Sequence, residues 1–133
     1  MELVKLIEFS LFKEDNGELA VFEENFEAIP FSIKRIFNVR SQKHSIRGKH
    51  AHRLCSQILV CSSGSIEVTC DDSINKEIFT LDKPNYGLLV SPGIWAEQKY
   101  LTNNASMTVI CDRLYEADDY ISNYDDFKVF KGF

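Results

Sequence analysis

Apolar and polar residues alternate in short runs along most of the chain, and turn-forming residues separate these runs. Runs of this length and period indicate β-strands rather than helices. We expect strands at 3–9, 18–22, 31–39, 57–61, 66–70, 77–81, 88–90 and 107–111. Between the first two runs, Asp15-Asn16-Gly17 predicts a tight hairpin because Asn-Gly tolerates positive φ.

Helical periodicity is nearly absent. No interval between the runs has the roughly ten helical residues that a parallel βαβ unit would require. Strands at this regular spacing are typical of an all-β sandwich or barrel. The one predicted helix is short and late, at 118–124, where Asp118 and Asp119 would favour a helix N-terminus. Without linkers or repeats, we expect residues 1–133 to form one domain.

Composition narrows the class of protein. The chain has 133 residues, of which 44% are hydrophobic and 26% charged, as in ordinary globular proteins. Its net charge of −5 disfavours a nucleic-acid or anionic-membrane binder. No apolar run reaches about 18 residues, so we expect no membrane span. An early acidic residue and the lack of a small-residue cleavage site argue against a signal peptide, so we expect a cytoplasmic protein.

The cysteines agree with that location. Cys55, Cys61, Cys70 and Cys111 show no Cys-x-x-Cys spacing, and the last three lie in apolar, β-like runs. We therefore expect reduced, buried thiols that pack as small hydrophobic side chains.

One polar segment, residues 47–57, stands apart from the apolar runs. His50 and His52 are at i and i+2, so on a strand both imidazoles would point to the same side while Ala51 points away. Arg47 lies just upstream. Two imidazoles on one face favour a functional site over a structural role, and an unperturbed pKa near ~6.5 suits proton transfer.

The spacing of this segment resembles the first motif of the cupin family: His-x-His, an acceptor side chain at Gln57, then Gly64. The resemblance implies an all-β cupin jelly roll, or double-stranded β-helix, with a metal bound by the histidines and a later Glu. Here Gln57 replaces that Glu, and the second motif keeps Pro92-Gly93 but has no histidine. A catalytic metal commonly has three or more protein ligands. We therefore expect no metal, although Glu97 or Asp112 could complete a site.

Five longer elements carry a closer resemblance. They are PFSIKR at 30–35, RGKHAHR at 47–53, QILVCSSGSIEV at 57–68, LDKPNYGLLVSPGIWAE at 81–97 and YEADDYISNYDDF at 115–127. Together they are similar to the metal-independent cupin sugar 3,4-ketoisomerases, the FdtA-like or WxcM-like enzymes, over nearly the whole chain.

This resemblance implies an isomerase that moves the keto group of dTDP-4-keto-6-deoxyglucose from C4 to C3. The product would be a dTDP-3-keto-6-deoxyhexose, galacto or gluco, for 3-amino-3,6-dideoxyhexose synthesis, as in O-antigen deoxysugars. The family also implies no cofactor and a homodimer that exchanges N-terminal strands.

The reaction defines the groups that are needed. A base can remove the C3 proton because it is α to the C4 ketone, and reprotonation of the enediolate at C4 leaves the ketone at C3. Donors must hold the oxyanion meanwhile. We expect His52 to be the base and His50 to position the sugar or shuttle protons. Arg47 would stabilise the oxyanion or the diphosphate; the spacing alone leaves open which imidazole moves the proton.

Further substrate contacts are expected at Arg35, Gln57, Trp95 and Lys83. A guanidinium such as Arg35 suits a diphosphate, although a solvated outer face would explain it equally well. Gln57 would hydrogen-bond the hexose or a structural partner. Trp95 would form cavity wall or core, and Lys83 would lie on the nucleotide side. We expect the acidic C-terminal stretch to be a solvated face.

The chain departs from the family at a few positions. Phe37-Asn38 stands where tyrosines are usual, Ala96 replaces a large basic or imidazole side chain, and Asn16 occupies a variable position before Gly17. These departures leave the C4 configuration of the product open. They favour, as an alternative, a non-catalytic nucleotide-sugar-binding cupin; a metal-dependent cupin enzyme is a further alternative.

Overall fold

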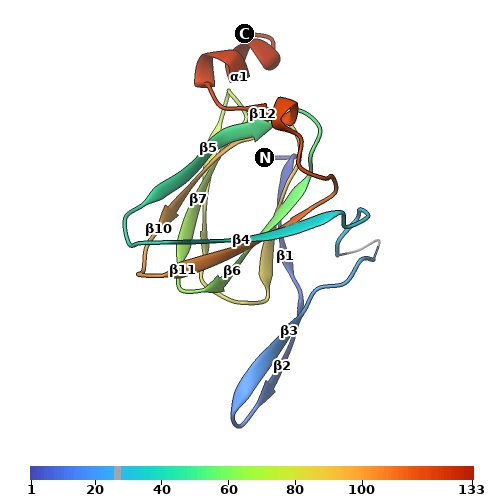
Figure 1. Ribbon diagram of the computed structural model, residues 1–133, viewed down its shortest axis with the longest axis vertical. Helices are drawn as coiled ribbons and strands as arrows, with labels where there is room; N and C mark the ends of the chain where they lie inside the picture. Colours follow the sequence, from blue (N-terminus) through green and yellow to red (C-terminus); the bar gives the residue numbers. More distant parts are fainter. Residues whose placement is uncertain (26–27) are drawn as a thin grey trace.

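The computed structural model describes residues 1–25 and 28–133, which consist mostly of antiparallel strands. Two five-stranded sheets face each other, and a separate hairpin projects from one end (Figure 1). The strand order is β1-β9-β6-β11-β4 in the first sheet and β12-β5-β10-β7-β8 in the second. This architecture confirms the expected all-β jelly roll.

The bounds of the elements are as follows. The first sheet contains β1 (Val4–Glu8), β4 (Arg35–Ser41), β6 (Gln57–Ser63), β9 (Tyr86–Val90) and β11 (Ala105–Cys111). The second contains β5 (Ile46–His52), β7 (Ile66–Asp71), β8 (Lys76–Leu81), β10 (Trp95–Tyr100) and β12 (Tyr120–Ile121). The hairpin is β2 (Ser10–Glu14) and β3 (Gly17–Val21), and the helices are the 3-10 helix η1 (Ala117–Asp119) and α1 (Tyr124–Phe130).

The first sheet is covered on both faces, which explains why β6 reads as an unbroken apolar run rather than an alternating one. Leu59 and Cys61 of β6 face the interior between the sheets. Ile58 and Val60 point the other way, into a cluster closed by Ile29 and neighbouring residues of the segment before β4. All four cysteines are free and buried, as expected.

That covering segment corrects one prediction. The strand predicted over 31–39 begins only at Arg35. Phe31 and Ile33 lie against the outer face of the first sheet instead, and Glu24 Oε1 accepts a hydrogen bond from the backbone N–H of Ile33 at 2.7 Å. The apolar side chains that favoured a strand are buried by this packing.

The C-terminal prediction is also wrong in position. Of residues 118–124 only the last lies in the helix; the others contain the end of η1 and the short strand β12. The helix begins at Tyr124, where the side chain of Asn123 accepts a hydrogen bond from the N–H of Asp126 at 3.0 Å. Tyr120 and Ile121 pair with β5 instead, since ladder hydrogen bonds to an open sheet edge outweigh a weak local helix preference.

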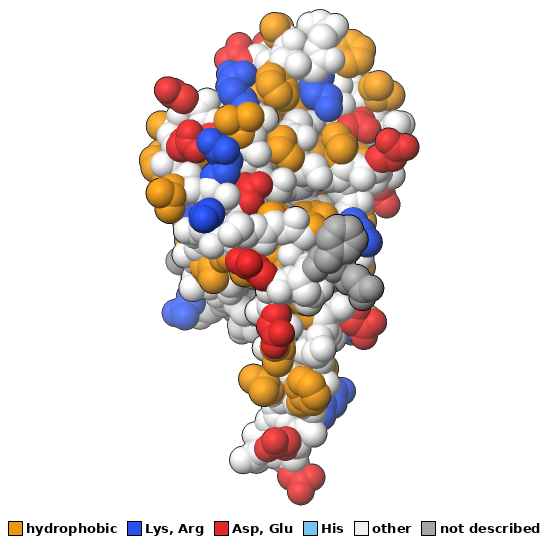
Figure 2. All heavy atoms as spheres, turned by 90° about the vertical axis from the view of Figure 1, so that its right-hand side faces the viewer, with side chains coloured by type: hydrophobic (Ala, Val, Ile, Leu, Met, Phe, Trp, Pro, Cys, Tyr) orange, Lys and Arg blue, Asp and Glu red, His pale blue; other side chains and the backbone are white. Residues whose placement is uncertain are grey.

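The β2–β3 hairpin forms at the predicted Asn-Gly turn and extends away from the two sheets (Figure 1). It exposes hydrophobic side chains toward its tip (Figure 2), including Phe12 and Leu19, which are 57% and 61% exposed. In the described part of the chain, no helix combines the length and apolar character needed to cross a membrane.

Candidate active site

A β-bulge in β5 aims the two histidines. Ala96 of β10 pairs with His50, and Glu97 pairs with Gly48, so Lys49 is the extra residue. Gly48 and Lys49 both have positive φ, 86° and 56°, and a Cβ on Gly48 would lie only 3.0 Å from the Ala96 carbonyl oxygen. A bulge of this kind re-aims the side chains beside it. It precedes the His-x-His motif directly.

His50 and His52 point to one side of β5, as predicted. Their ring centroids are 5.0 Å apart and the rings are nearly perpendicular, at 87°. Ala51 points to the opposite side, where it is fully buried with Trp95, Ile121 and Phe127.

Asp119 holds His52 in place. Its Oδ2 lies 2.8 Å from His52 Nδ1, and both side chains are buried. Its Oδ1 accepts the backbone N–H of Leu54 at 2.6 Å, and its carbonyl accepts the N–H of Arg53 at 2.9 Å. The carboxylate therefore fixes both the imidazole and the turn that follows β5. With Nδ1 donating to Asp119, His52 Nε2 is the basic nitrogen, and that atom is buried without a hydrogen-bond partner among residues 1–25 and 28–133.

Tyr120 closes the site from β12. It pairs with His52 in the ladder, so its ring lies on the same side as the imidazoles. Its centroid is 4.4 Å from that of His52 and 5.0 Å from that of His50. The Tyr115 ring lies 5.7 Å from that of Tyr120 and 5.6 Å from Arg35 Cζ, which places a phenol and a guanidinium on this side of the two histidines.

A cavity of about 160 Å³ opens beside these groups, between the two sheets. Arg47, His50, Gln57, Gln98 and Tyr120 supply its polar lining. Its apolar wall and remaining backbone come from Phe37, Val39, Gly48, Leu59 and Val109. The structure thus brings three of the expected site residues, Arg47, His50 and Gln57, to one cavity.

Arg35 lies at the edge of this site. Its guanidinium stacks over the rings of Phe37 and Tyr115, with its Cζ 5.2 and 5.6 Å from the centroids, and its Nη2 donates to Cys111 Sγ at 3.6 Å. The solvated outer face considered for this residue is therefore wrong. Gln57, the residue at the cupin ligand position, donates to the same sulfur at 3.6 Å.

Two residues that were expected to contact the substrate lie outside this cavity. Trp95 is buried in the cluster beneath α1, and its indole N–H donates to Glu97 Oε2 at 3.1 Å, so it forms core rather than cavity wall. Alternation along β10 explains this, because its neighbour Ala96 faces His50. Lys83 is exposed in the loop between β8 and β9, where its ammonium stacks over Tyr86.

The donors considered for a metal do not converge. Gln57 is bonded to Cys111, Glu97 to Trp95, and Asp112 Oδ1 accepts the backbone N–H of Ser56 at 3.0 Å. The sulfur of Cys55 lies within 4.8 Å of donor atoms of His52 and Asp119, but these two are already joined directly by a hydrogen bond. We read this group as a histidine–carboxylate pair.

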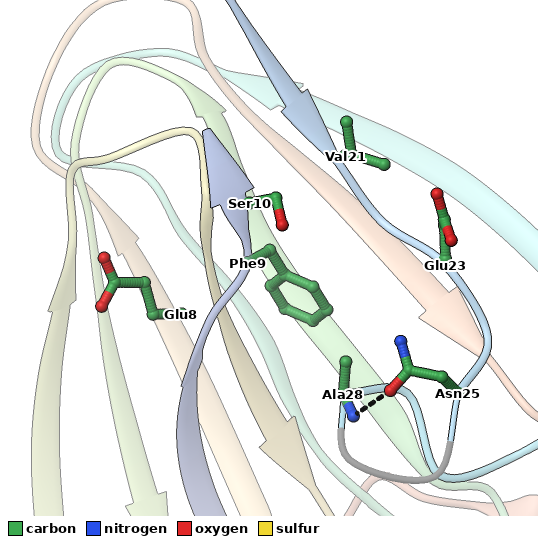
Figure 3. A pocket seen from close by; sticks show the side chains of 7 residues that line it. All are labelled: Glu8, Phe9, Ser10, Val21, Glu23, Asn25 and Ala28. Atoms are coloured by element: carbon green, nitrogen blue, oxygen red, sulfur yellow. Dashed lines mark hydrogen bonds between the residues drawn. The ribbon is translucent and has the colours of Figure 1, made fainter. Parts of the chain in front are cut away.

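A second cavity of similar volume, about 160 Å³, lies where β1 runs into the hairpin (Figure 3). Glu8, Phe9, Ser10, Val21, Glu23, Asn25 and Ala28 line it. Among these described residues none carries an imidazole, a thiol or a guanidinium, so the cavity beside β5 is the candidate active site.

Burial and neighbouring charges shift the pKa values of the titratable groups in the site. Desolvation lowers the pKa of His50, and the neighbouring His52 lowers it further. Desolvation also lowers the pKa of His52, against the opposing effect of Asp119. Burial opposes ionisation of Asp119, but hydrogen bonds from His52 and from the N–H groups of Leu54 and Cys55 hold its pKa below its usual range. Two neutral imidazoles and a carboxylate therefore face one another at neutral pH.

Sequence reasoning missed Asp119 and Tyr120. Both lie in the acidic stretch that was expected to be a solvated face, yet Asp119 is buried against His52. One signal was available: Asp-Tyr-Ile belongs to the tail that carries the family resemblance, and its three residues alternate polar, aromatic and aliphatic as in a strand. A site of this kind can exchange protons with a bound molecule through paired imidazoles.

The chain is similar in sequence to a known protein family and to a curated relative. The family model described as FdtA, WxcM-like, C-terminal, matches residues 2–132. A TDP-4-oxo-6-deoxy-alpha-D-glucose-3,4-oxoisomerase from Aneurinibacillus thermoaerophilus is 40% identical over 125 residues, covering 93% of this chain and 89% of that protein.

Solved structures are similar as well. A mutant of the 3,4-ketoisomerase QdtA from Thermoanaerobacterium thermosaccharolyticum, in complex with TDP-4-keto-6-deoxyglucose, has a TM-score of 0.92 at 30% identity over 98% of this chain and 95% of that one. The WlaRB TDP-quinovose 3,4-ketoisomerase from Campylobacter jejuni has a TM-score of 0.88 at 31% identity, over 96% and 98%.

Proposed function

The chain belongs to the FdtA, WxcM-like family, and we propose that it is a sugar 3,4-ketoisomerase. Its substrate is dTDP-4-keto-6-deoxyglucose, the sugar named for the curated relative and bound in the QdtA complex. The observation that carries this proposal is the pair of imidazoles beside one cavity, one of them held by a buried carboxylate. Proton transfer between adjacent carbons and oxygens needs such groups and no net oxidation.

Two kinds of proton must move. One leaves C3 and a proton arrives at C4, while the hydroxyl at C3 loses a proton and the oxygen at C4 gains one. A neutral imidazole can both accept and return a proton, so two imidazoles can divide these tasks. The low pKa values of His50 and His52 keep both in the accepting form at neutral pH.

We propose that the two histidines divide these tasks. The sequence pointed to His52 as the base, but His50 is the imidazole that lines the cavity. We assign the carbon proton to His50 and the oxygen protons to His52, whose Nδ1 contact with Asp119 leaves Nε2 free to accept. Asp119 would stabilise the imidazolium that forms at His52, as a carboxylate beside a catalytic histidine does in general.

The remaining lining residues hold the negative charges. Arg47 is exposed at the cavity, where a guanidinium can bind the diphosphate. Arg35 lies near enough to His52 to lower the pKa of that imidazole, and from there its guanidinium can stabilise charge that develops on the enediolate oxygens. The amides of Gln57 and Gln98 can hydrogen-bond the hydroxyls of the hexose. Lys83 and Trp95 take no part in this cavity.

The departures from the family bear on specificity. Phe37 lines the cavity, so an apolar ring stands where a tyrosine is usual. Asn38 turns away and accepts a hydrogen bond from Thr108 Oγ1 at 2.6 Å. Ala96 pairs with His50 in the ladder, where the family commonly has a larger side chain. Phe37 and Ala96 are therefore the departures that lie closest to the proton-transfer groups and would bear on the C4 configuration of the product.

Incubation with dTDP-4-keto-6-deoxyglucose in heavy water tests the proposal. We expect deuterium at C4 and a 3-keto product, and NMR of that product gives its configuration. Binding without exchange would favour the non-catalytic binding module instead. Absence of both binding and exchange would contradict any role in this reaction.

We propose that the protein is a homodimer. The β2–β3 hairpin extends from the sheets with Phe12 and Leu19 exposed, and exposed apolar side chains of this size favour burial against a second copy. Asn16 lies in the turn between β2 and β3 and is not among the residues that line the cavity beside β5, so it would border a sugar only across such an interface. Light scattering should give twice the chain mass, and Phe12→Ser with Leu19→Ser should give monomers. A wild-type monomer would contradict the dimer.

We also propose that the enzyme works in the cytoplasm. Its four cysteines are free and buried, in keeping with a reducing compartment. Fractionation of cells that express the protein tests this location.

A further inference from the structure

Cys111 is a nucleophilic side chain within the site that the proton-transfer scheme does not use. It ends β11, where it pairs in register with Arg35 on one side and Gln57 on the other. Its sulfur accepts hydrogen bonds from Arg35 Nη2 and Gln57 Nε2, each at 3.6 Å. Two donors, one of them charged, therefore converge on one fully buried sulfur.

Arg35 needs an anion at this place. Within the described residues, no carboxylate lies within ion-pair distance of its guanidinium. Its surroundings are the rings of Phe37 and Tyr115, the phenol of Tyr120 and the sulfur of Cys111. A partly buried charge without a partner is costly, and a thiolate at Cys111 would supply the opposite charge at hydrogen-bond distance.

We propose that Cys111 is a positioning residue of the active site, a thiolate that fixes Arg35 and Gln57 beside the catalytic histidines. Arg35 in turn stacks over Tyr115, whose ring centroid lies 5.7 Å from that of Tyr120, and the Tyr120 ring lies against both imidazoles. The sulfur thus anchors one side of the cavity without touching the substrate. This inference rests on the proposed ketoisomerase activity for its kinetic part only.

The electrostatics of the four thiols agree with this assignment. The Cys55 thiol, followed by Arg35 and Gln57, holds the pKa of Cys111 below its usual range against the effect of burial. The neighbouring Cys111 sulfur and burial raise the pKa of Cys55, which stays protonated and donates to the Ser56 carbonyl at 3.4 Å. Burial raises the pKa of Cys61 to about 11 and that of Cys70 to about 12. The charged and titratable groups around the pair are Arg35, Tyr120, Asp112, His52 and Asp119.

The first test needs no substrate. The native protein should show the ultraviolet absorbance of one thiolate per chain at neutral pH. Cys111→Ser should remove this absorbance, whereas Cys70→Ser, which changes an equally buried thiol away from Arg35, should leave it intact. A wild-type protein without thiolate absorbance at neutral pH, or absorbance that survives in Cys111→Ser, overturns the proposal.

The second test separates charge from packing. Cys111→Ser should lower kcat/KM about ten- to a hundredfold, because Arg35 loses a charged acceptor. Cys111→Asp, which restores a negative charge, should recover part of that loss, and Cys70→Ser should match the wild type. Wild-type kinetics in Cys111→Ser, or a Cys111→Asp variant that folds but is no better than Cys111→Ser, overturns it. If the wild type makes no 3-keto product, the proposed function fails, while the absorbance result still decides the state of Cys111.

Discussion

The two sides of strand β5 differ sharply although their residues alternate along a single segment. On one side, His50 and His52 meet Tyr120, Asp119 and a cavity. On the other side, Ala51 packs with Trp95, Ile121 and Phe127 beneath α1 in an apolar cluster. Tyr120 and Ile121 of β12 extend this division, since each lies on the side of the β5 residue that it pairs with.

The contrast shows how a C-terminal segment can serve stability and chemistry at once. The apolar side anchors β12 and α1 to the sheet, and this anchoring delivers Asp119 and Tyr120 to the polar side. Substitutions on the polar side should therefore reduce activity with little loss of stability. Substitutions on the apolar side should reduce stability with little change in the activity of the folded protein.

The largest effect is expected on the polar side. His50→Asn should lower kcat by about 10²- to 10⁴-fold, the range for loss of a general acid or base. Its melting temperature should stay near that of the wild type because His50 is only partly buried. NMR spectra recorded at successive times during substrate conversion measure kcat. His44→Asn, which changes an exposed histidine in the loop before β5, is the matched control.

The second-largest effect on activity is expected for Asp119→Asn. The asparagine oxygen can still accept the Leu54 N–H, but its amide would then donate to His52 Nδ1 and place the imidazole proton on Nε2. We expect kcat to fall by roughly 10²-fold or more, with the tautomer change visible in nitrogen NMR. Asp118→Asn, at the neighbouring exposed acid, should leave both unchanged. An unaltered tautomer in Asp119→Asn would contradict the assigned contact.

Phe127→Ala tests the apolar side. Phe127 is fully buried against Trp95 and Tyr124, so its truncation should cost about 3–5 kcal/mol of unfolding free energy. Denaturant unfolding measures this loss, and kcat of the remaining folded protein should stay close to the wild type. Val129→Ala, at a side chain 70% exposed on the same helix, should be nearly neutral. A large fall in kcat under conditions where the variant is fully folded would show that the apolar side of β5 also affects catalysis.

The smallest effect is a dependence on pH. Both imidazoles have lower pKa values in the folded than in the unfolded chain, so the unfolded chain binds more protons. Stability should therefore be full above about pH 6.5 and fall as the pH drops toward the folded pKa values. Activity should be lost over the same range, with a midpoint below about 6.5. The double variant His50→Asn with His52→Asn should weaken the pH dependence of unfolding; an unchanged dependence would assign it to other groups.

Much of this protein could be predicted from local pattern. The alternation of apolar residues marked most of the strands, and the i, i+2 spacing placed His50 and His52 on one side of β5. Strand β10 was missed because it is mixed in polarity: Trp95 and Tyr100 are buried, while Lys99 between them is exposed. Its place in the sheet depends on partners on both sides, β5 and β7.

The sequence by itself determined the fold class, the pairing of the two imidazoles and the resemblance to a family, because these depend on periodicity and on motifs of a few residues. Only the tertiary structure decided that Asp119 supports His52, that Tyr120 covers both rings, and that Cys111 meets Arg35. These contacts join residues 67, 68 and 76 positions apart, which no local pattern relates. They form because burying Ile121 and Phe127 against β5 carries the C-terminal segment to the site, and because sheet register places β11 between β4 and β6.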